Sequence, residues 1–591
     1  MLVLVLILVA LTAIFASLVR HLSHDPLERS AIGLLGGLIV LMYAPQLAYF
    51  TMGSLRMANL VTALAGLTVG IGLALRWAAR RFPTTVTVSV DHQLFGQFSR
   101  SPYLLTLAGT AAIIIAASAW ISTHYWQFDW DGWSYHSSAL AWFYQQNALT
   151  PMPLVDWIIG YPKNIEFLGL WAFLLEGSDQ HIDSVNLLLH IVTLPFAYGL
   201  GRRIGLDSRW ALAGALLYFL TPTLAQQTWT TYVDQAFADS IVIALFFLFT
   251  WMQSEGAQRH VWTVLLGCTL GHLAHTKGTG LHVMLLVGAF VVIYEVRAKR
   301  ARQLPQQLAL LAAPTVLLGA GWYLHTWWLM GNPFFPYQIH LPISQQVLFP
   351  GPINFKQSLM TNLGISVRVH DPLPVLYYRM FGQSGWGLQF FALGLPAALL
   401  CLFKGNAAMR WLVGFGIAYL VVTPFSYIDR YAVFVTLVGA LAFAYGAQHW
   451  LAHLRWARIL LPFSAVAIVL SAVPVLQATK PDMAGPFHPP PVDAFATTEG
   501  FKRFALVNAL PPGLRIGVTD LTSGSDDPYW YFYFGPRWQN RVEPFDVARA
   551  AEYDVVVCSA RGGRCAQVAV LGLFSRVLID ADVEVYRRDN K

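Results

Sequence analysis

The most conspicuous candidates for chemistry lie in one short polar stretch beside an apolar segment. Residues 128–136 read Phe-Asp-Trp-Asp-Gly-Trp-Ser-Tyr-His and follow an apolar run that ends near Trp120. The stretch holds two carboxylates, Asp129 and Asp131, and the imidazole of His136. Ionisable groups beside an apolar segment are costly to desolvate, so they are kept where they serve a function. This stretch is therefore the first candidate for a functional site.

The spacing of the two carboxylates favours a shared cavity. Asp129 and Asp131 are two residues apart, so in an extended segment both side chains point to the same side. A carboxylate there can act as a general base on a hydroxyl or hold a divalent cation such as Mg²⁺ or Mn²⁺. The alternative is structural: the pair marks the water interface and caps a helix that begins near Gly132. Tyr135 and His136 follow on that helix, where an aromatic ring can stack on a sugar.

Further charged residues stand at the ends of later apolar runs. Asp234 begins one run, where it serves as a site carboxylate, as a helix cap and dipole partner, or as both. Asp239 lies more than a turn deeper, where a polar neighbour would be enough to explain its burial. His272 and His275 have no Cys or carboxylate at ligand spacing, so a structural or phosphate-assisting role fits better than a metal site.

Two cations lie in short turns between apolar runs. The compact ammonium of Lys277 suits a phosphate or pyrophosphate, and the alternative is a lysine that extends its charge to the membrane surface. Arg430 stands between Asp429, which can neutralise it locally, and Tyr431. If Lys277 and Arg430 converge in the fold, they form a clamp for a phosphate at the membrane surface.

Composition places these residues in a membrane protein. Of the 591 residues, 56% are hydrophobic and only 12% are charged, which leaves too little polar surface for a soluble protein of this size. The net charge of +7 does not indicate nucleic-acid binding, because Lys and Arg form short clusters between apolar runs. Such clusters are typical of charge that fixes membrane orientation. The sequence therefore predicts a polytopic membrane protein with no nucleic-acid partner.

About fourteen segments are long and apolar enough to span a hydrocarbon core, which takes about 20 residues. Their boundaries are uncertain by about 4 residues. They lie near residues 2–19, 31–50, 59–75, 103–123, 182–200, 210–225, 235–253, 261–275, 279–296, 306–328, 386–403, 411–425, 431–451 and 459–476.

Basic clusters fix the expected orientation, since they fall in alternate loops and basic loops stay in the cytoplasm. The clusters are Arg20, then Arg76, Arg80 and Arg81, then Arg202, Arg203 and Arg209, then Arg259, then Arg297, Lys299, Arg300 and Arg302, then Lys404 and Arg410, then Arg455 and Arg458. The loop with the polar stretch, residues 329–385 and everything after 477 are then on the outer face. We expect the first run to be an N-out anchor rather than a cleaved signal peptide.

The sequence predicts one connector and one folded outer loop among the segments that precede residue 182. Residues 84–100 are a cytoplasmic connector without recognisable chemistry. In the outer loop 124–181, Trp142-Phe143-Tyr144 and residues 167–175 read as amphipathic helices in the plane of the membrane interface, able to roof a cavity.

The tail after residue 480 has a soluble composition and predicts a small α/β domain on the outer face. Residues 514–518, 554–557 and 583–586 read as strands, and 542–551 reads partly as a helix. Cys558 and Cys565 are seven residues apart, so they either form a disulfide in an oxidising compartment or remain free. Cys268 and Cys401 lie in membrane helices and are expected to be inert.

Taken together, these features resemble the bacterial membrane glycosyltransferases of the GT-C superfamily, whose relatives include the protein O-mannosyltransferases and the aminoarabinose transferases. The resemblance rests on the order of apolar runs, the acidic first outer loop, Asp234 at a helix start, Lys277, the Gly331-Asn332-Pro333-Phe334-Phe335-Pro336-Tyr337 segment and the Asp429-Arg430-Tyr431 triplet. Trp130-Asp131 with Tyr135-His136, followed by Tyr161-Pro162-Lys163-Asn164, is especially similar to the bacterial branch. We therefore expect added helices and a connector at 1–102, a GT-C-like catalytic core at 103–476 and a soluble domain at 477–591.

The resemblance implies a mechanism. Members transfer a sugar, usually with inversion, from a polyprenyl-phosphate carrier to a lipid, glycan or protein on the outer face of the cytoplasmic membrane. It implies Asp131 as the base, Asp129 as its neighbour or alternative, and Asp234 as a second acidic residue. Lys277 and Arg430 would bind the carrier phosphate, with Tyr135, His136 and Tyr431 completing the substrate site.

Some points stay open at the sequence level. The resemblance leaves open whether a divalent cation assists. Two other functions remain: a ligase or polymerase of lipid-linked saccharides with a pyrophosphate carrier, and a transporter. Transporters usually show internal repeats and ionisable residues at mid-membrane, whereas the candidates in this chain cluster at one face.

Overall fold

The computed structural model describes most of the chain. The described residues are 1–82, 101–124, 129, 131–152, 156–340, 346–354, 380, 385–423, 428–451, 457–477, 506–507, 509–519, 530–559, 564–580 and 583–589. The connector predicted at 84–100 and much of the outer segment 329–385 lie outside them.

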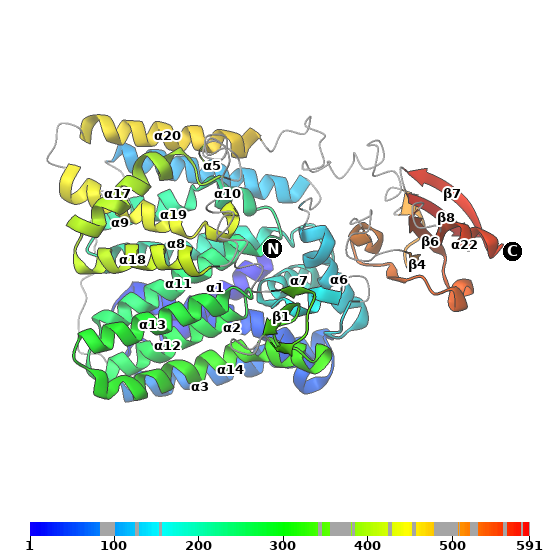
Figure 1. The fold of residues 1–591 in the computed structure, drawn as a ribbon, viewed down its shortest axis with the longest axis horizontal. Helices are drawn as coiled ribbons and strands as arrows, with labels where there is room; N and C mark the ends of the chain where they lie inside the picture. The colour runs from blue at the N-terminus through cyan, green and yellow to red at the C-terminus, as the bar shows by residue number, and fades with distance from the viewer. Residues whose placement is uncertain are drawn as a thin grey trace.

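Long helices that run side by side form the larger part of the molecule (Figure 1). In a bilayer the backbone must satisfy its own hydrogen bonds, which is why apolar runs of this length become helices. The helices over the predicted runs are α1 (Leu2–Leu18), α2 (Pro26–Met52), α3 (Met57–Arg81), α5 (Pro102–His124), α8 (Ser184–Arg203), α9 (Ser208–Phe219), α11 (Val233–Gln253), α12 (Gly256–Ala274), α13 (Gly280–Arg297), α14 (Leu304–Met330), α17 (Leu395–Lys404) with the π-helix η4 (Phe390–Gly394), α18 (Ala407–Val422), α19 (Val435–Gly446) and α20 (Ala457–Gln477).

The chain is a helical multi-pass membrane protein. Among the described helices, seven are long and apolar enough to cross a membrane, and four more apolar helices are shorter. Every predicted run coincides with a helix, while the number of fourteen spans stays a prediction. Helices α2 and α11 lie in the middle of the bundle, with 89% and 94% of their apolar windows buried inside the protein.

Small residues allow the closest helix pair to form. Helices α12 and α14 pack along each other, and a Cβ atom at Gly267 would lie 2.4 Å from the backbone oxygen of Leu311. At Gly271 the same test gives 2.8 Å to the Thr315 oxygen. Helices in lipid associate through such close backbone approaches. The packing of α14 against α12 therefore fixes the position of the turn after α12, and this turn carries Lys277.

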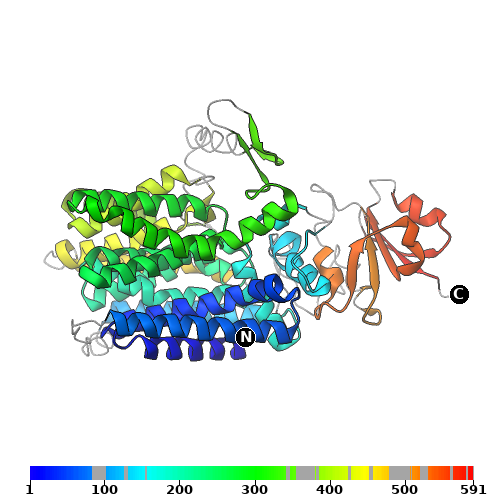
Figure 2. The same cartoon turned by 90° about the horizontal axis from the view of Figure 1, so that it is seen from below.

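Shorter elements gather at the end of the bundle nearest the C-terminal domain (Figures 1 and 2). They are the π-helix η1 (Gly132–His136), α6 (Ser137–Gln146), η2 (Asp156–Gly160), α7 (Asn164–Glu176), α10 (Pro222–Gln227), β1 (Tyr337–His340), β2 (Val347–Phe349), β3 (Ile353–Asn354) and η5 (Asp429–Ala432). Two others, η3 (Ala301–Gln303) and the π-helix η6 (Ala447–Leu451), lie at the opposite end, where η6 contacts the turn between α8 and α9. Strand β1 pairs antiparallel with β2 and parallel with β3.

Helices α6 and α7 confirm the two helices predicted in the first outer loop, but α7 is a core element. Residues 164–173 are buried, because α2, α6 and α8 pack around the helix. The prediction of an amphipathic helix with one face toward the interface is therefore wrong for α7, and its continuous apolar sequence is the reason.

The C-terminal domain is a small mixed sheet. Its elements are β4 (Arg515–Val518), η8 (Trp530–Phe534), β5 (Arg541–Pro544), η9 (Val547–Glu552), β6 (Val555–Ser559), α22 (Arg564–Val570), β7 (Phe574–Asp580) and β8 (Val583–Arg588), in strand order β5-β4-β6-β8-β7. Strands β5, β4 and β6 are parallel, and β8 pairs antiparallel with β6 and β7. The three predicted strands are confirmed, and the segment 542–551 divides between β5 and η9.

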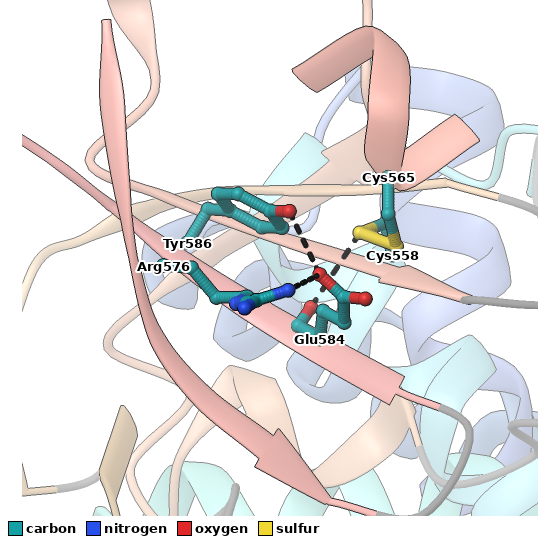
Figure 3. Close-up of a disulfide and its surroundings, with 5 residues drawn as sticks. All are labelled: Cys558, Cys565, Arg576, Glu584 and Tyr586. Carbon is teal, nitrogen blue, oxygen red and sulfur yellow. Dashed lines mark hydrogen bonds and ion pairs between the residues drawn. A yellow bond between two sulfur atoms is a disulfide. The ribbon is translucent and has the colours of Figure 1, made fainter. Parts of the chain in front are cut away.

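Cys558 and Cys565 form a disulfide, which the sequence left open. It joins the end of β6 to α22 across a Cα–Cα distance of 5.4 Å (Figure 3). Beside it, Glu584 of β8 accepts a hydrogen bond of 2.7 Å from the Tyr586 hydroxyl and pairs with Arg576 at 3.3 Å. Cys268 and Cys401 are free.

An aromatic segment attaches this domain to the outer loop. The indole of Trp538 stacks on Phe173 of α7, with ring centroids 3.7 Å apart. The hydroxyl of Tyr531 donates a hydrogen bond of 2.6 Å to Asp179, and the Asp179 amide donates to the Pro536 oxygen at 2.9 Å. Because η8 also packs against η1, the C-terminal domain contacts the element that carries the polar stretch.

Candidate active site

A cavity of about 300 Å³ opens at this end of the bundle. Its volume is in the range of small-molecule sites. Its lining comes from η1, the turn before α7, the start of α11, the turn after α12, β1, β3 and the segment around η5. The lining residues are Asp131, Tyr135, His136, Tyr161, Pro162, Val233, Asp234, Thr276, Lys277, Gly278, Thr279, Tyr337, Ile353, Ile428 and Tyr431. Six of the eight residues expected from the sequence are among them.

A π-helical turn places two of these residues on one side. Asp131 precedes η1 and His136 ends it, and the amide of Ser137 donates to the oxygen of Gly132 five residues earlier. In an α-helix of 3.6 residues per turn, residues five apart point roughly 140° away from each other. The wider π-turn brings the two side chains toward the same side of the helix, and such turns are frequent at functional sites. Asp131 and His136 therefore face the same cavity.

Two cations and two carboxylates meet at the cavity. Arg430 pairs with Asp131 at 3.1 Å and with Asp234 at 3.2 Å. Lys277 forms an ion pair with the other oxygen of Asp234, and its ammonium lies 3.7 Å from the ring centroid of Tyr431. Lys277 and Arg430 are 19% and 27% exposed, whereas Asp234 is only 3% exposed. The convergence expected of the two cations is therefore present, and Asp234 is the residue that joins them.

Electrostatics keep the arginine of this cluster charged. Burial by itself would lower the pKa of Arg430, but Asp234 and Asp131 outweigh it and raise that pKa. Its guanidinium also lies 4.4 Å from the ring centroid of Tyr232. The guanidinium is therefore fixed behind the two carboxylates that line the cavity, while Arg430 itself is not among the lining residues.

Asp129 has the structural role that the sequence offered as the alternative, at the start of the helix near Gly132. Its Oδ1 accepts a hydrogen bond of 2.7 Å from the Gly132 amide, and its Oδ2 accepts one of 2.9 Å from the Thr231 amide. Burial raises the pKa of Asp129, despite the hydrogen bond from Thr231. The expectation that both carboxylates face one cavity is wrong, because the chain turns into a helix at Asp131 instead of staying extended. Asp129 ties the start of η1 to the segment before α11.

A buried ion cluster behind the cavity was missed by the sequence analysis. Oε1 of Glu166 lies 2.8 Å from Nδ1 of His136 and accepts a hydrogen bond of 3.0 Å from the ammonium of Lys163. Lys163 is fully buried, and His136 and Glu166 are 3% and 5% exposed. Burial would raise the pKa of Glu166, but Lys163 and His136 overcome it and lower this pKa to about 2. The sequence contains one signal for this cluster, since Lys163 and Glu166 stand three residues apart at the start of an apolar segment.

The remaining candidates have structural partners. Asp239 lies 3.0 Å from Nδ1 of His190 and accepts a hydrogen bond of 3.0 Å from Tyr218. His272 lies 3.2 Å from Ser240, and His275 lies 3.0 Å from the Leu318 oxygen. Within the part of the chain that the structure describes, no group of three or more His, Cys, Asp or Glu side chains could hold a metal ion.

A family comparison finds a similarity over the middle part of the chain. Residues 104–330 match the model of the dolichyl-phosphate-mannose-protein mannosyltransferases. The matched segment contains Asp131, His136, Asp234 and Lys277, which the fold brings to one cavity. The match covers less than half of the 591 residues, so the chain is similar to this family over that segment. No curated protein sequence matches the chain.

Solved structures of similar fold support the helical architecture. The chain is similar to ArnT from Cupriavidus metallidurans bound to undecaprenyl phosphate, with 15% identity, 82% of this chain and 98% of that chain covered, and a TM-score of 0.53. The apo state of the same ArnT gives 14% identity, coverage of 82% and 97%, and a TM-score of 0.54. At this identity the similarity is one of fold.

Proposed function

We propose that the enzyme transfers a sugar from a polyprenyl-phosphate carrier to the hydroxyl of a lipid, glycan or protein acceptor on the outer face of a bacterial cytoplasmic membrane. One observation supports the assignment to this cavity: Lys277 and Asp131 line it, and Arg430 pairs with its two carboxylates, Asp131 and Asp234. The matching family uses a sugar on dolichyl phosphate, and the ArnT of similar fold was solved with undecaprenyl phosphate.

Lys277 and Arg430 hold the phosphate of the carrier. Asp234 pairs with both cations in the free enzyme, and Lys277 lines the cavity, where a phosphate can accept the remaining hydrogen bonds of its ammonium. A second, mainly apolar cavity of about 200 Å³ adjoins the first through Tyr161, Gly278 and Tyr337. It runs to Leu285 of α13, which is 67% exposed on the helix surface. This is a route by which the polyprenyl chain leaves toward lipid.

The chemistry is a displacement at the anomeric carbon. The acceptor oxygen forms a bond to this carbon while the bond to the phosphate oxygen breaks, and the phosphate leaves with the electron pair. Attack opposite the leaving phosphate inverts the anomeric centre. Asp131 accepts the hydrogen bond of the acceptor hydroxyl as base, which typically contributes about 10²- to 10⁴-fold in rate. Lys277 and Arg430 stabilise the charge on the leaving phosphate.

The cavity gives no support for a divalent cation as a resident group. Asp131 and Asp234 are the carboxylates that line it, and both are ion-paired with Arg430. Mg²⁺ and Mn²⁺ would need several oxygen ligands from these same groups. We therefore derive no step of the transfer through a metal ion.

The disulfide supports the proposed orientation. Disulfides persist in oxidising compartments, and Cys558–Cys565 lies in the domain that contacts η1. With an N-out first helix and fourteen spans, residues 477–591 are on the outer face together with the site. The basic clusters are then cytoplasmic.

The test is sugar transfer in membrane vesicles that contain the full chain. Undecaprenyl phosphate carrying radiolabelled mannose or aminoarabinose is supplied in separate reactions, and label is followed into lipid, glycan and protein. We expect transfer by the wild type and a loss of about 10²-fold or more in Asp131→Asn and Asp131→Ala. Full transfer by both variants would overturn the proposal. Transfer only from an undecaprenyl-pyrophosphate saccharide would instead favour a ligase.

A further inference from the structure

His136 lines the cavity and is held by the buried ion cluster, but the transfer chemistry gives it no role. Its Nδ1 lies 2.8 Å from Glu166, while its buried Nε2 has no hydrogen-bond partner among the described residues. The ring lines the cavity beside Asp131. A buried nitrogen without a partner is costly, and in a residue that lines the cavity it leaves one hydrogen bond for a ligand to supply.

The cluster behind His136 fixes which nitrogen carries the proton. Glu166 accepts a hydrogen bond from Lys163, which is fully buried and donates to no other side chain that the structure describes. A buried ammonium needs a charged partner, so Glu166 is ionised and can only accept hydrogen bonds. Nδ1 of His136 must therefore donate to Glu166, which leaves the lone pair of the neutral ring on Nε2.

We propose that His136 is the final proton acceptor of the transfer, and that Glu166 and Lys163 are positioning residues for it. The inference rests on the proposed function. When the acceptor oxygen bonds to the anomeric carbon, its proton leaves by way of Asp131 and ends on Nε2 of His136. The carrier phosphate takes the electron pair of the broken bond. The resulting imidazolium donates to Glu166 from Nδ1 and is stabilised by its negative charge.

The position of Asp131 explains why a second acceptor is needed. Arg430 lies 3.1 Å from the Asp131 carboxylate and pairs with it. We assign to Asp131 the orientation of the acceptor hydroxyl and the first, transient step of the proton transfer. His136 follows one π-turn later on the same side and carries a carboxylate partner of its own, so it retains the proton.

Other charged and titratable groups surround His136 or line the same cavity, and they must be considered when a pH profile is interpreted. They are Asp129, Asp131 and Tyr135 at η1, Lys163 and Glu166 at the start of α7, Asp234 on α11, and Tyr161, Lys277 and Tyr431 elsewhere in the lining. Among them only the imidazole ordinarily changes charge between about pH 5 and 8. An acidic limb of the transfer rate in this range therefore reports His136.

A structural role is the competing interpretation. His136 and Glu166 also line a cavity of about 20 Å³ between η1, α7 and α8, which is large enough for one water molecule. If Nε2 only makes a hydrogen bond across that space, replacing His136 lowers stability and leaves the pH profile of the remaining activity unchanged. The pH profile therefore distinguishes the two roles.

The experiment measures kcat, KM for the donor and their pH dependence in vesicles. His136→Gln should lower kcat by about 10²- to 10⁴-fold, keep KM for undecaprenyl-phosphate mannose or aminoarabinose within about twofold, and abolish the acidic limb. Glu166→Gln leaves Lys163 buried without a charge partner, so the double variant Lys163→Met/Glu166→Gln is used as well. We expect it to fold and to move the acidic limb to lower pH.

The chain offers a matched control. Nδ1 of His181 lies 2.7 Å from Glu176 at the other end of α7, and this pair does not line the cavity. His181→Gln and Glu176→Gln should leave rate and pH profile unchanged. An unchanged acidic limb in His136→Gln, with normal thermal unfolding, overturns the inference. Full activity of Asp131→Asn overturns the proposed function instead, so the two failures are distinguishable.

Discussion

At the residue scale, the site depends on which carboxylate each cation holds. Asp234 is buried and forms ion pairs with both Lys277 and Arg430. Asp131 forms an ion pair with Arg430 and lines the cavity. Asp234 thus fixes the cations, and Asp131 remains able to meet a substrate. The sequence predicted these residues and their outer position, but nothing in it gives the order in which they pair.

Loss of either cation should weaken binding of the carrier phosphate. A hydrogen bond to a charged group is worth about 1.5–3 kcal/mol, so Lys277→Met and Arg430→Met should each raise the Kd for undecaprenyl phosphate about tenfold or more. Tryptophan fluorescence titration in detergent micelles checks this. Arg297→Met, on the cytoplasmic side of α13 in the proposed orientation, is the control, and equal affinity of all four proteins would contradict the assignment.

The ion cluster at Glu166 should make stability depend on acid pH. The pKa of Glu166 falls from 4.5 to about 2, so its ionised form stabilises the fold fully above about pH 4.5, and this is lost as the pH falls toward 2. Acidification from about pH 6 to about pH 3.5 should therefore lower the Tm of the wild type more than that of Lys163→Met/Glu166→Gln. Equal shifts in Tm would show that the cluster contributes no such stabilisation.

At the element scale, the π-helix η1 and the turn before α7 decide what the site can do. Periodicities of 2 and 3.6 residues are the signals a sequence offers. Neither describes a π-turn, which is why Asp129 was expected in the cavity beside Asp131. Asp131 and His136, which were expected at one site, both line the cavity. The long apolar runs, by contrast, were read correctly as helices because their composition alone determines their structure in lipid.

A glycine below the cavity should be required for its shape. A Cβ atom at Gly160 would lie 2.0 Å from the backbone oxygen of Phe335, so the segment before Tyr161 and the segment before β1 touch through their backbones. Gly160→Ala should force them apart, destabilise the fold by about 1–3 kcal/mol and reduce transfer. Gly66→Ala in α3, where nothing lies within 4 Å, is the control for thermal unfolding. A Gly160→Ala protein as active and stable as Gly66→Ala would contradict the close approach.

The aromatic attachment of the C-terminal domain should stabilise the outer loop. Trp538 is 3% exposed and stacks on Phe173 of α7. Trp538→Ala should cost about 3–5 kcal/mol, seen as a lower Tm of the whole chain in detergent. Val570→Ala, at a position 86% exposed, should change nothing. An unchanged Tm in the tryptophan variant would mean that the domain is not attached through this contact.

At the scale of the whole molecule, one end of the helical bundle carries the chemistry. The C-terminal domain lies at the end of the bundle where α6, α7 and β1 gather (Figure 1). Residues of β1 and of the turn before α7 line both cavities at this end. Composition and basic clusters predicted a polytopic protein with this end outside. Long-range contacts such as Trp538 on Phe173 join residues far apart in the chain, and no local pattern encodes them.

The orientation can be tested with reporter fusions at the C-terminus. Alkaline phosphatase fused after Lys591 should be active in a bacterial host, because it folds only in an oxidising compartment. Fluorescent protein fused at the same place should be dark. The opposite pattern would place the site on the cytoplasmic face and contradict the topology.

The most direct measurement is an experimental structure of the full chain with undecaprenyl phosphate. We expect the phosphate in contact with both Lys277 and Arg430, the Asp131 carboxylate beside Arg430 and facing the acceptor, and the lipid chain leaving past Leu285 of α13. A phosphate bound elsewhere, with this cavity empty, would contradict the central claim.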